Sequence, residues 1–305
     1  MEYFSHGKVL LTAEYAVLDG VKALALPTLK GQSLKVKETS TETIVWKAYT
    51  HDHNCWIDVV FDFNFSCIEA HETSKEVIQK LTTILIALDH LSPQFQKNGL
   101  EINTYLDFPQ NWGLGSSSTL INNLAQWLNI NPYELLEKTL GGSGYDIAAA
   151  QSKYPLFYTR KAFTPIIETV PFYPSFNDRL YFVHLNQKRN SQEAILNYMK
   201  RASLSTSIKK RLEKIGEELV HCASQKEEAW CTTKRGSMVH HKEREHCASQ
   251  REGAWCITKR GVLQTCGGQN VNWSCRMQLY RNMFACCINQ GMQRFGSIFW
   301  ISAVA

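Results

Sequence analysis

The sequence predicts an α+β fold of two domains with an atypical C-terminal end. Three observations support this prediction. The 305 residues are enough for two domains of ordinary size. Strand-like and helix-like hydrophobic patterns are mixed along the first 220 residues. The composition then changes near residue 221, which separates the end of the chain from the rest.

The change near residue 221 affects charge, cysteine and proline together. Residues 1–220 carry 22 Lys and Arg against 23 Asp and Glu, whereas residues 221–305 carry 11 against 5. Eight of the ten cysteines lie after residue 220, and all eight prolines lie at or before Pro174. The net charge of +5 therefore belongs to the C-terminal part alone.

The composition also indicates a soluble protein. Hydrophobic residues make up 44% and charged residues 20%, a mixture typical of folded soluble chains. The first six residues contain no basic segment followed by an apolar run, so we expect no signal peptide. No apolar stretch approaches the ~20 residues that cross a bilayer. We therefore expect no membrane partner and a cytoplasmic location, where thiols stay reduced.

The elements of the first half follow from local patterns. Aromatic, β-branched or alternating residues predict strands at 8–12, 32–37, 43–49, 55–61 and 100–106. A capping Thr-Ser pair and apolar residues at helical spacing predict a helix from Ser74 to about Leu91. Further helices are predicted after the glycine pair Gly113 and Gly115, from Asn131 to Gly141, and near residues 145–150. In the second half we expect a strand at 180–185 and helices at 191–201 and 206–219.

One glycine-rich segment stands out, PQNWGLGSSST from Pro109 to Thr119. Glycines let the backbone approach a ligand closely, and the first amides of the following helix have no helical partner. Together with the helix dipole they form an anion site. The hydroxyls of Ser116 and Ser117 can add ligands for phosphate or Mg²⁺. From these residues alone, a glycine turn with a serine cap explains the segment equally well.

Two further segments carry candidate catalytic groups. Asp146 follows the Gly-Ser-Gly turn 142–144 and can point its carboxylate into a cleft, although the helix dipole also favours an acid in a first helical turn. Lys8 lies in a β-prone run and can face a reacting hydroxyl, although a solvated strand lysine explains it as well. Neither residue is diagnostic by itself.

In their order and spacing, the three segments resemble the GHMP kinase superfamily. Residues 7–20, GKVLLTAEYAVLDG, resemble the opening motif of mevalonate and phosphomevalonate kinases. Residues 109–119 resemble the phosphate-binding motif, and residues 143–146, SGYD, resemble the segment with the catalytic aspartate. The pentapeptide GYDIA at 144–148 is similar to that of a branch of these kinases. The resemblance covers roughly residues 1–220.

The resemblance implies a two-domain GHMP kinase fold and an ATP-dependent phosphotransferase that uses Mg²⁺. Asp146 would accept or orient the substrate hydroxyl proton, and Lys8 would lower the pKa of that hydroxyl and bind phosphate oxygens. Ser117 would lie near Mg²⁺, with Ser116 as an alternative. The residues implied to hold the ATP phosphates are Trp112, Gly113, Leu114, Gly115, Ser116, Ser117 and Ser118.

The implied partner is a small alcohol or phosphorylated alcohol of the mevalonate-pathway type, with no nucleic acid. The acceptor itself and the oligomeric state stay open. A glutamate that binds Mg²⁺ in mevalonate kinases has its nearest counterparts in Glu134 and Glu137, and we assign the role to neither. The domains implied are residues 1–155, which hold the phosphate loop and the aspartate, a partial second domain at 156–220, and a tail at 221–305.

The tail departs from the family. GHMP kinases carry a third glycine-rich motif near the C-terminus, but here the sequence after Gly253-Ala254-Trp255 continues Cys-Ile-Thr. Residues 221–236 and 246–261 are two copies of one segment, with thirteen of sixteen positions identical. We expect a frameshifted or duplicated end that does not pack as a normal second-domain terminus. A nucleotide-binding pseudokinase is the alternative function. The cysteines within each copy are nine apart, which does not fit the spacing of structural zinc sites.

Overall fold

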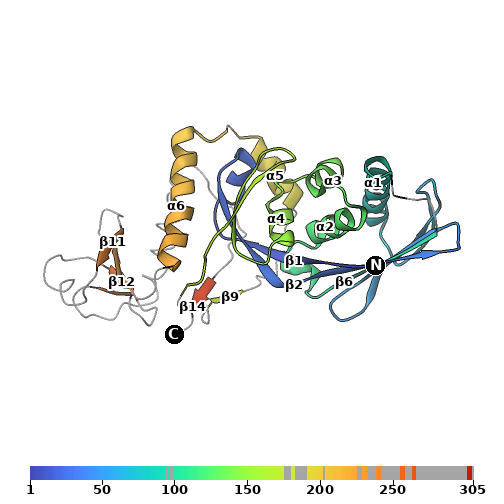
Figure 1. Cartoon of the computed structure of the whole chain (residues 1–305), viewed down its shortest axis with the longest axis horizontal. Coiled ribbons are helices and arrows are strands. Elements are labelled where there is room, and N and C mark those ends of the chain that lie inside the picture. The colour runs from blue at the N-terminus through green and yellow to red at the C-terminus, as the bar shows by residue number, and fades with distance from the viewer. Residues whose placement is uncertain are drawn as a thin grey trace. The chain divides into compact units, whose positions relative to one another are not determined.

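The protein is described from a computed structural model of the chain (Figure 1). The described residues are 1–93, 95, 99–174, 180–182, 191–201, 203–224, 229–232, 238–241, 255–257, 263–265 and 301–303. The chain divides into two compact units, one of residues 1–171 and 186–220 and one of residues 172–185 and 221–305. Each unit is described by itself.

The first unit contains a mixed eight-stranded sheet in the order β5-β4-β3-β6-β2-β7-β8, with β1 paired to β2. Only the β3–β6 pairing is parallel among these strands. The strands are β1 (Glu2–Leu10), β2 (Ala23–Thr39), β3 (Ile44–Tyr49), β4 (Cys55–Phe61), β5 (Cys67–His71), β6 (Gly99–Leu106), β7 (Leu156–Thr159) and β8 (Ile166–Thr169).

The long strand β2 organises this sheet. Its first residues pair with β7, its later residues pair with β6, and β1 runs antiparallel to it from Glu2↔Lys35 to Leu10↔Ala25. A register shift between His6 and Lys8 marks an irregularity in β1. The N-terminal segment is thereby held along the long strand β2.

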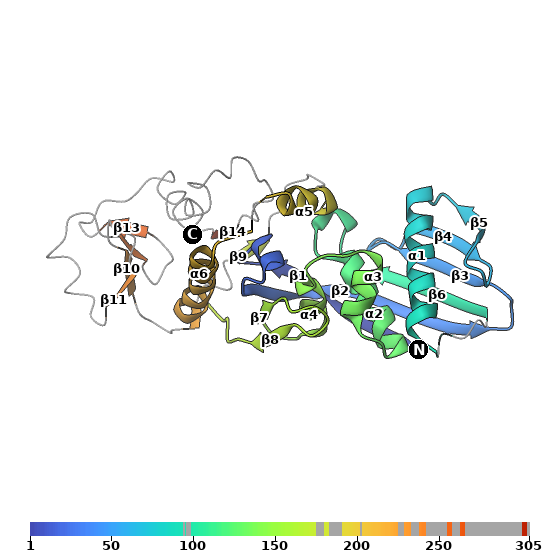
Figure 2. The same cartoon turned by 90° about the horizontal axis from the view of Figure 1, so that it is seen from above.

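Helices α1 to α4 lie on one face of the sheet, as Figure 2 shows from above. The helices are α1 (Lys75–Leu91), α2 (Ser116–Leu128), α3 (Pro132–Thr139), α4 (Tyr145–Gln151), α5 (Ser191–Met199) and α6 (Thr206–Ser224), with 3-10 turns η1 (Ala16–Asp19) and η2 (Gln110–Trp112). The main core lies between this face and the helices, and it includes Leu34, Trp46, Phe61, Leu85, Leu88, Ile121 and Leu124. Within the described residues, no helix has the length and apolar content to cross a bilayer.

The local predictions agree with most of these elements. The Ser74 hydroxyl caps α1, and Asn131 caps α3 with Pro132 in its first turn, as the sequence predicts. Strand β1 begins at Glu2 rather than at Lys8, and β2 extends well beyond the predicted 32–37. The predicted strands were too short because the pairing of β1 with β2 outweighs local propensity, even at Gly31, which pairs with His6.

The second unit contains short strands. They are β9 (Leu180–Phe182), β10 (Ala229–Thr232), β11 (Met238–His241), β12 (Trp255–Ile257), β13 (Leu263–Thr265) and β14 (Ile301–Ala303). One sheet has the order β11-β10-β12-β13, and β14 pairs with β9. Each copy of the internal repeat contributes one strand to the four-stranded sheet, with Cys231 opposite Cys256. Two expectations concern the tail: that it binds no zinc, and that it does not pack as a normal end of the second domain. Both depend on residues that lie mostly outside the described ranges, so both stay predictions.

Candidate active site

The glycine-rich segment forms a tight turn that opens helix α2. Gly113 ends the turn η2 with φ 73°, and Gly115 precedes the helix with φ 88° and ψ 42°. These are left-handed conformations that favour glycine. The helix begins at Ser116, so the amides of Ser116, Ser117 and Ser118 have no acceptor one turn earlier. This arrangement is an anion-binding helix start.

Lys8 crosses this turn from strand β1. Its backbone N–H donates to the Leu114 carbonyl at 2.9 Å. Its aliphatic stem passes Gly115 so closely that a Cβ there would lie 3.1 Å from the Lys8 Cγ and 3.3 Å from its Cε. The backbone angle at residue 115 therefore favours glycine, and a side chain there would also press on the Lys8 stem. The half-buried Lys8 thus lies against the start of α2.

Asp146 enters the same site from helix α4. Gly144 precedes that helix with φ 85°, and a Cβ on it would meet the Tyr158 Oη at 2.7 Å. The Ser118 hydroxyl donates to the Asp146 carboxylate, and the Ile147 amide donates to its other oxygen at 3.2 Å. The structure thus brings the starts of α2 and α4 together. Lys8, the glycine turn and Asp146, which lie in three separate segments of the sequence, are close together in the structure.

The three serines of the α2 start differ in their surroundings. Ser116 is half-buried, Ser117 is exposed and Ser118 is buried. Because the Ser118 hydroxyl is bonded to Asp146, the exposed Ser117 is the better placed of these hydroxyls for a solvent-borne ligand. The Trp112 amide donates to the Pro109 carbonyl at 3.0 Å, which occupies it within the turn.

Tyr145 and Lys8 form the electrostatic centre of the site. The Lys8 Nζ lies 5.3 Å from the centroid of the Tyr145 ring, within the range of a cation–π contact. Burial acts to lower the pKa of Lys8, but Tyr145, Asp146 and Glu14 outweigh it and raise this pKa above its ordinary value. Burial raises the pKa of Tyr145 to about 12, with Lys8 acting in the opposite direction. At neutral pH the site therefore holds a charged lysine beside a neutral phenol.

Glu14 joins the site although the sequence did not single it out. Loss of hydration raises the pKa of the Glu14 carboxyl, and the positive charge of Lys8 partly offsets this rise. Its neighbours Ala13 and Tyr15 have φ of 60° and 57°. The Glu14 carbonyl accepts a hydrogen bond from the Ala16 amide at 2.7 Å, which closes a three-residue γ-turn. The signal in the sequence was its place in the GHMP-like opening motif, which by itself does not separate Glu14 from its neighbours.

A buried polar network holds α2 in place behind the site. The Asn122 side chain donates to the Ser5 hydroxyl at 2.8 Å and accepts from Gln151 of α4 at 2.9 Å. The Asn123 amide donates to the Gln32 carbonyl at 2.8 Å. Because burying such groups unpaired costs ~1–3 kcal/mol each, the network constrains α2 against β1, β2 and α4.

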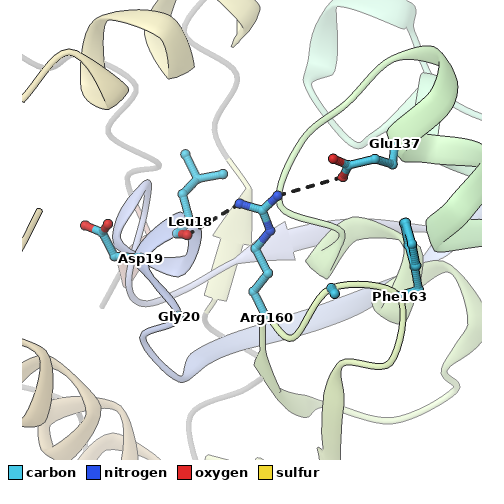
Figure 3. Close-up of a pocket in the computed structure, with 7 residues that line it drawn as sticks. Leu18, Asp19, Gly20, Glu137, Arg160 and Phe163 are labelled. Atoms are coloured by element: carbon cyan, nitrogen blue, oxygen red, sulfur yellow. Dashed lines mark hydrogen bonds and ion pairs between the residues drawn. The ribbon is translucent and has the colours of Figure 1, made fainter.

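An open cleft of about 410 Å³ lies beside the turn at Asp19 and Gly20 (Figure 3). The Arg160 guanidinium points across it, 3.5 Å from the Leu18 carbonyl and 3.9 Å from the Glu137 carboxylate. The lining residues are Leu18, Asp19, Gly20, Glu137, Arg160, Ala162 and Phe163. The cleft is therefore built from other residues than the predicted catalytic pair and phosphate loop.

The two glutamates considered for Mg²⁺ both have cationic neighbours. Glu137 faces Arg160, and Glu134 lies 4.0 Å from the Lys138 ammonium, four residues along α3. Among the described residues, no group of three or more His, Cys, Asp and Glu side chains is arranged to hold a metal ion. The assignment of a carboxylate to Mg²⁺ stays open.

The fold resembles those of solved kinases. The phosphomevalonate kinase of Streptococcus pneumoniae, solved with phosphomevalonate and AMPPNP, has a TM-score of 0.52 at 14% identity and covers 74% of each chain. The mevalonate kinase of Methanococcus jannaschii has a TM-score of 0.49 at 18% identity over 72% of each chain. Lactococcus lactis galactokinase, solved with galactose, has a TM-score of 0.45 at 14% identity over 73% of this chain and 65% of the other.

No family model and no curated protein sequence matches the chain. The likeness to the phosphomevalonate kinase therefore concerns the fold. The prediction of an α+β GHMP kinase fold is confirmed at that level.

Proposed function

We propose that this chain is an ATP-dependent phosphotransferase that moves the γ-phosphoryl group of ATP to a small alcohol or phosphorylated alcohol. One observation carries the proposal. Strand β1, the start of α2 and the start of α4 converge, so that Lys8 and Asp146 both lie at a glycine-bounded helix N-terminus. A cation, an anion site and a carboxylate in contact are the groups that phosphoryl transfer needs.

In this proposal the segment from Trp112 to Ser118 binds the ATP phosphates through the amides that open helix α2, since the Trp112 amide already donates to the Pro109 carbonyl. The glycine turn suits that role, because nothing lies within 4 Å of where a Gly113 Cβ would be and the amides of Ser116 to Ser118 open the helix. Ser117 contributes a hydroxyl to Mg²⁺, a cation that prefers oxygen ligands. When bound, Mg²⁺ neutralises charge on the transferring phosphates.

Asp146 and Lys8 act on the acceptor. The acceptor oxygen forms a bond to the γ-phosphorus while the bond from that phosphorus to the bridging oxygen of ADP breaks, and the hydroxyl proton passes to the Asp146 carboxylate. Lys8 stabilises the negative charge on the transferring oxygens, which its raised pKa supports by keeping it protonated. Ser118 orients Asp146 through their hydrogen bond.

The comparisons support ATP and a small acceptor without naming the acceptor. The phosphomevalonate kinase of similar fold was solved with AMPPNP, an ATP analogue, and with phosphomevalonate. A mevalonate-pathway alcohol or its phosphate is therefore the first acceptor to test. At this sequence identity the likeness supports the class of acceptor only.

The test is release of ADP from Mg-ATP in the presence of mevalonate, phosphomevalonate, galactose and related alcohols. We expect release with at least one acceptor and little without it. Mass spectrometry of the acceptor, which should gain one phosphoryl group, separates transfer from plain ATP hydrolysis. No substrate-dependent release with any acceptor would contradict the proposal.

A second candidate is a nucleotide-binding pseudokinase. The observation that favours it is the sequence after Trp255, which continues Cys-Ile-Thr, with Cys256 and Ile257 in strand β12, and carries no glycine-rich motif there. Calorimetry with AMPPNP distinguishes the two functions. Binding without turnover supports the pseudokinase, and turnover by the full chain rejects it.

A further inference from the structure

Helices α5 and α6 hold the segment that carries Glu14. The Tyr198 hydroxyl of α5 donates to an oxygen of the Asp19 carboxylate at 2.6 Å. The Tyr198 ring also stacks on the Tyr15 ring, with centroids 5.7 Å apart and planes 25° apart. One side chain thus contacts both ends of the turn η1, which lies next to α5 in Figure 1 and Figure 2.

Other groups from the same helical segment reinforce this contact at Asp19. The Ser203 hydroxyl donates to the second oxygen of the Asp19 carboxylate at 3.3 Å. The Lys209 ammonium donates to the Asp19 backbone carbonyl at 2.7 Å. Asp19 is therefore bound by donors from three positions of the segment 198–209.

Helix α6 also fixes the two flanks of the turn. A Cβ on the buried Gly216 would lie 3.3 Å from the Thr12 Oγ1, so the helix approaches the end of β1 closely. On the other flank, the Lys22 ammonium pairs with Glu217 at 2.9 Å, and the Lys22 amide donates to Glu213 at 3.3 Å. The whole stretch from Thr12 to Lys22 is held from one side.

The held stretch contains strained backbone. Ala13 and Tyr15 both have positive φ, and Tyr15 combines φ 57° with ψ −37°. Such conformations cost roughly 1–3 kcal/mol each and persist only where surrounding contacts enforce them. Glu14 lies between these two residues, six positions after Lys8, and its carboxylate is one of the groups that raise the pKa of Lys8. Contacts that hold Tyr15 therefore also hold the backbone of Glu14, whose carbonyl accepts the Ala16 amide.

We propose that Tyr198 is a positioning residue of the phosphoryl-transfer site, which fixes Glu14 relative to Lys8 by its stack on Tyr15 and its hydrogen bond to Asp19. The inference rests on the proposed function, and it assigns part of the site's geometry to α5. Tyr198 touches no reacting group and acts through Glu14.

The first experiment needs no activity. Hydrogen exchange of the Ala16 and Val17 amides, which donate to Glu14 and Ala13 at 2.7 and 2.9 Å, reports on the turn directly. In Tyr198→Phe, which keeps the ring and loses the hydroxyl, we expect faster exchange at these amides and unchanged exchange in α2. Tyr154→Phe, at an exposed tyrosine, is the matched control and should match wild type. Unchanged exchange in Tyr198→Phe overturns the proposal.

The second experiment is a double-mutant cycle on kcat/KM for the acceptor. We expect Tyr198→Phe to lower it roughly tenfold, the effect of one lost hydrogen bond to a charged group, with the KM for ATP unchanged. In a Glu14→Gln background the same change should have little further effect, because the lost contact acts through Glu14. Additive losses would show a merely structural role and overturn the proposal.

A second variant and the exchange measurement keep the proposal testable if Tyr198→Phe folds poorly or the chain shows no turnover. Ser203→Ala removes a second donor to the same carboxylate and should give a smaller loss with the same non-additivity, so the test survives if Tyr198→Phe folds poorly. If the wild-type chain shows no turnover, the proposed function fails while the exchange experiment still decides whether Tyr198 holds the turn.

Discussion

Helices α2 and α4 begin in the same way and present opposite charge. Each follows a glycine in the left-handed conformation, Gly115 or Gly144, and neither has a side-chain cap. The first turn of α2 carries no acid, so its unpaired amides attract an external anion. The first turn of α4 carries Asp146, which supplies an anion of its own.

The comparison shows that an acidic residue in the first turn decides whether a helix start preceded by glycine attracts an anion or supplies one. The two starts face each other through the bond from Ser118 to Asp146. In the proposed function, the α2 start binds phosphate and the α4 start accepts the proton. Lys8 lies beside both, along Gly115 and close enough to Asp146 for that carboxylate to raise its pKa. The following predictions test this division of roles.

The largest effect is expected from removing the charge of the α4 start. Asp146→Asn keeps the shape of the side chain but cannot accept the proton, so turnover should fall roughly 10²–10⁴-fold. AMPPNP affinity should change little, because the α2 start is intact. Initial rates of ADP release measure the turnover, and calorimetry measures the AMPPNP affinity. A variant that keeps most of its turnover removes Asp146 from the mechanism.

Lys8→Met tests the cation between the two starts. Turnover should fall by roughly 10²–10³-fold, because one charge-stabilising group of the transition state is lost. AMPPNP binding should weaken less than turnover. Lys37→Met, at an exposed lysine of β2, is the matched control and should behave as wild type. Equal losses of binding and turnover would show that Lys8 only binds the nucleotide.

Substitutions at the two glycines of the turn distinguish the effect of backbone strain from the effect of the contact with Lys8. Gly113→Ala and Gly115→Ala both force a left-handed alanine, at a cost of about 1–2 kcal/mol each. Only the Gly115 substitution also meets Lys8, since nothing lies within 4 Å of the Gly113 position. We expect Gly115→Ala to lower Tm further and to impair turnover more. Equal effects of the two substitutions would mean that the approach of Lys8 is unimportant.

Ser118→Ala tests the bond that joins the two starts. Loss of a hydrogen bond to a carboxylate should lower turnover about tenfold, with AMPPNP binding preserved because the amide of residue 118 remains. Ser152→Ala, at the other end of α4, removes a hydroxyl that donates to the Tyr154 carbonyl and serves as the control. A Ser118→Ala variant with the turnover of the control would show that Asp146 needs no such support.

The smallest effect concerns Tyr145 and appears only in alkali. Its folded pKa of about 12 lies above the ordinary tyrosine value of 10.0, so the folded state keeps a proton that the unfolded state loses. The resulting stability is complete below pH 10 and falls as the pH rises toward 12. Denaturant midpoints at pH 9 and pH 11 should differ less in Tyr145→Phe than in wild type. An equal difference in both would place Tyr145 outside the buried site.

The sequence predicted some elements well because their signals are local. Helices α1 and α3 have their caps and apolar periodicity within a few residues, and both form near the predicted positions. Strands β1 and β2 were predicted too short. Their extents depend on pairing between residues far apart, such as Glu2 with Lys35, which local propensity does not contain.

By itself, the sequence named the candidate groups of this site. The glycine turn, the serines of α2, Lys8 and Asp146 could be named because their segments, in order and spacing, resemble the motifs of one kinase superfamily, although none of them is diagnostic by itself. Only the tertiary structure decided which groups meet. It set the Ser118 hydroxyl on Asp146, added Glu14 and Tyr145 around Lys8, and placed Tyr198 on Tyr15. Those contacts join segments distant in the chain, and they exist because strand pairing and helix packing bury the surfaces between them.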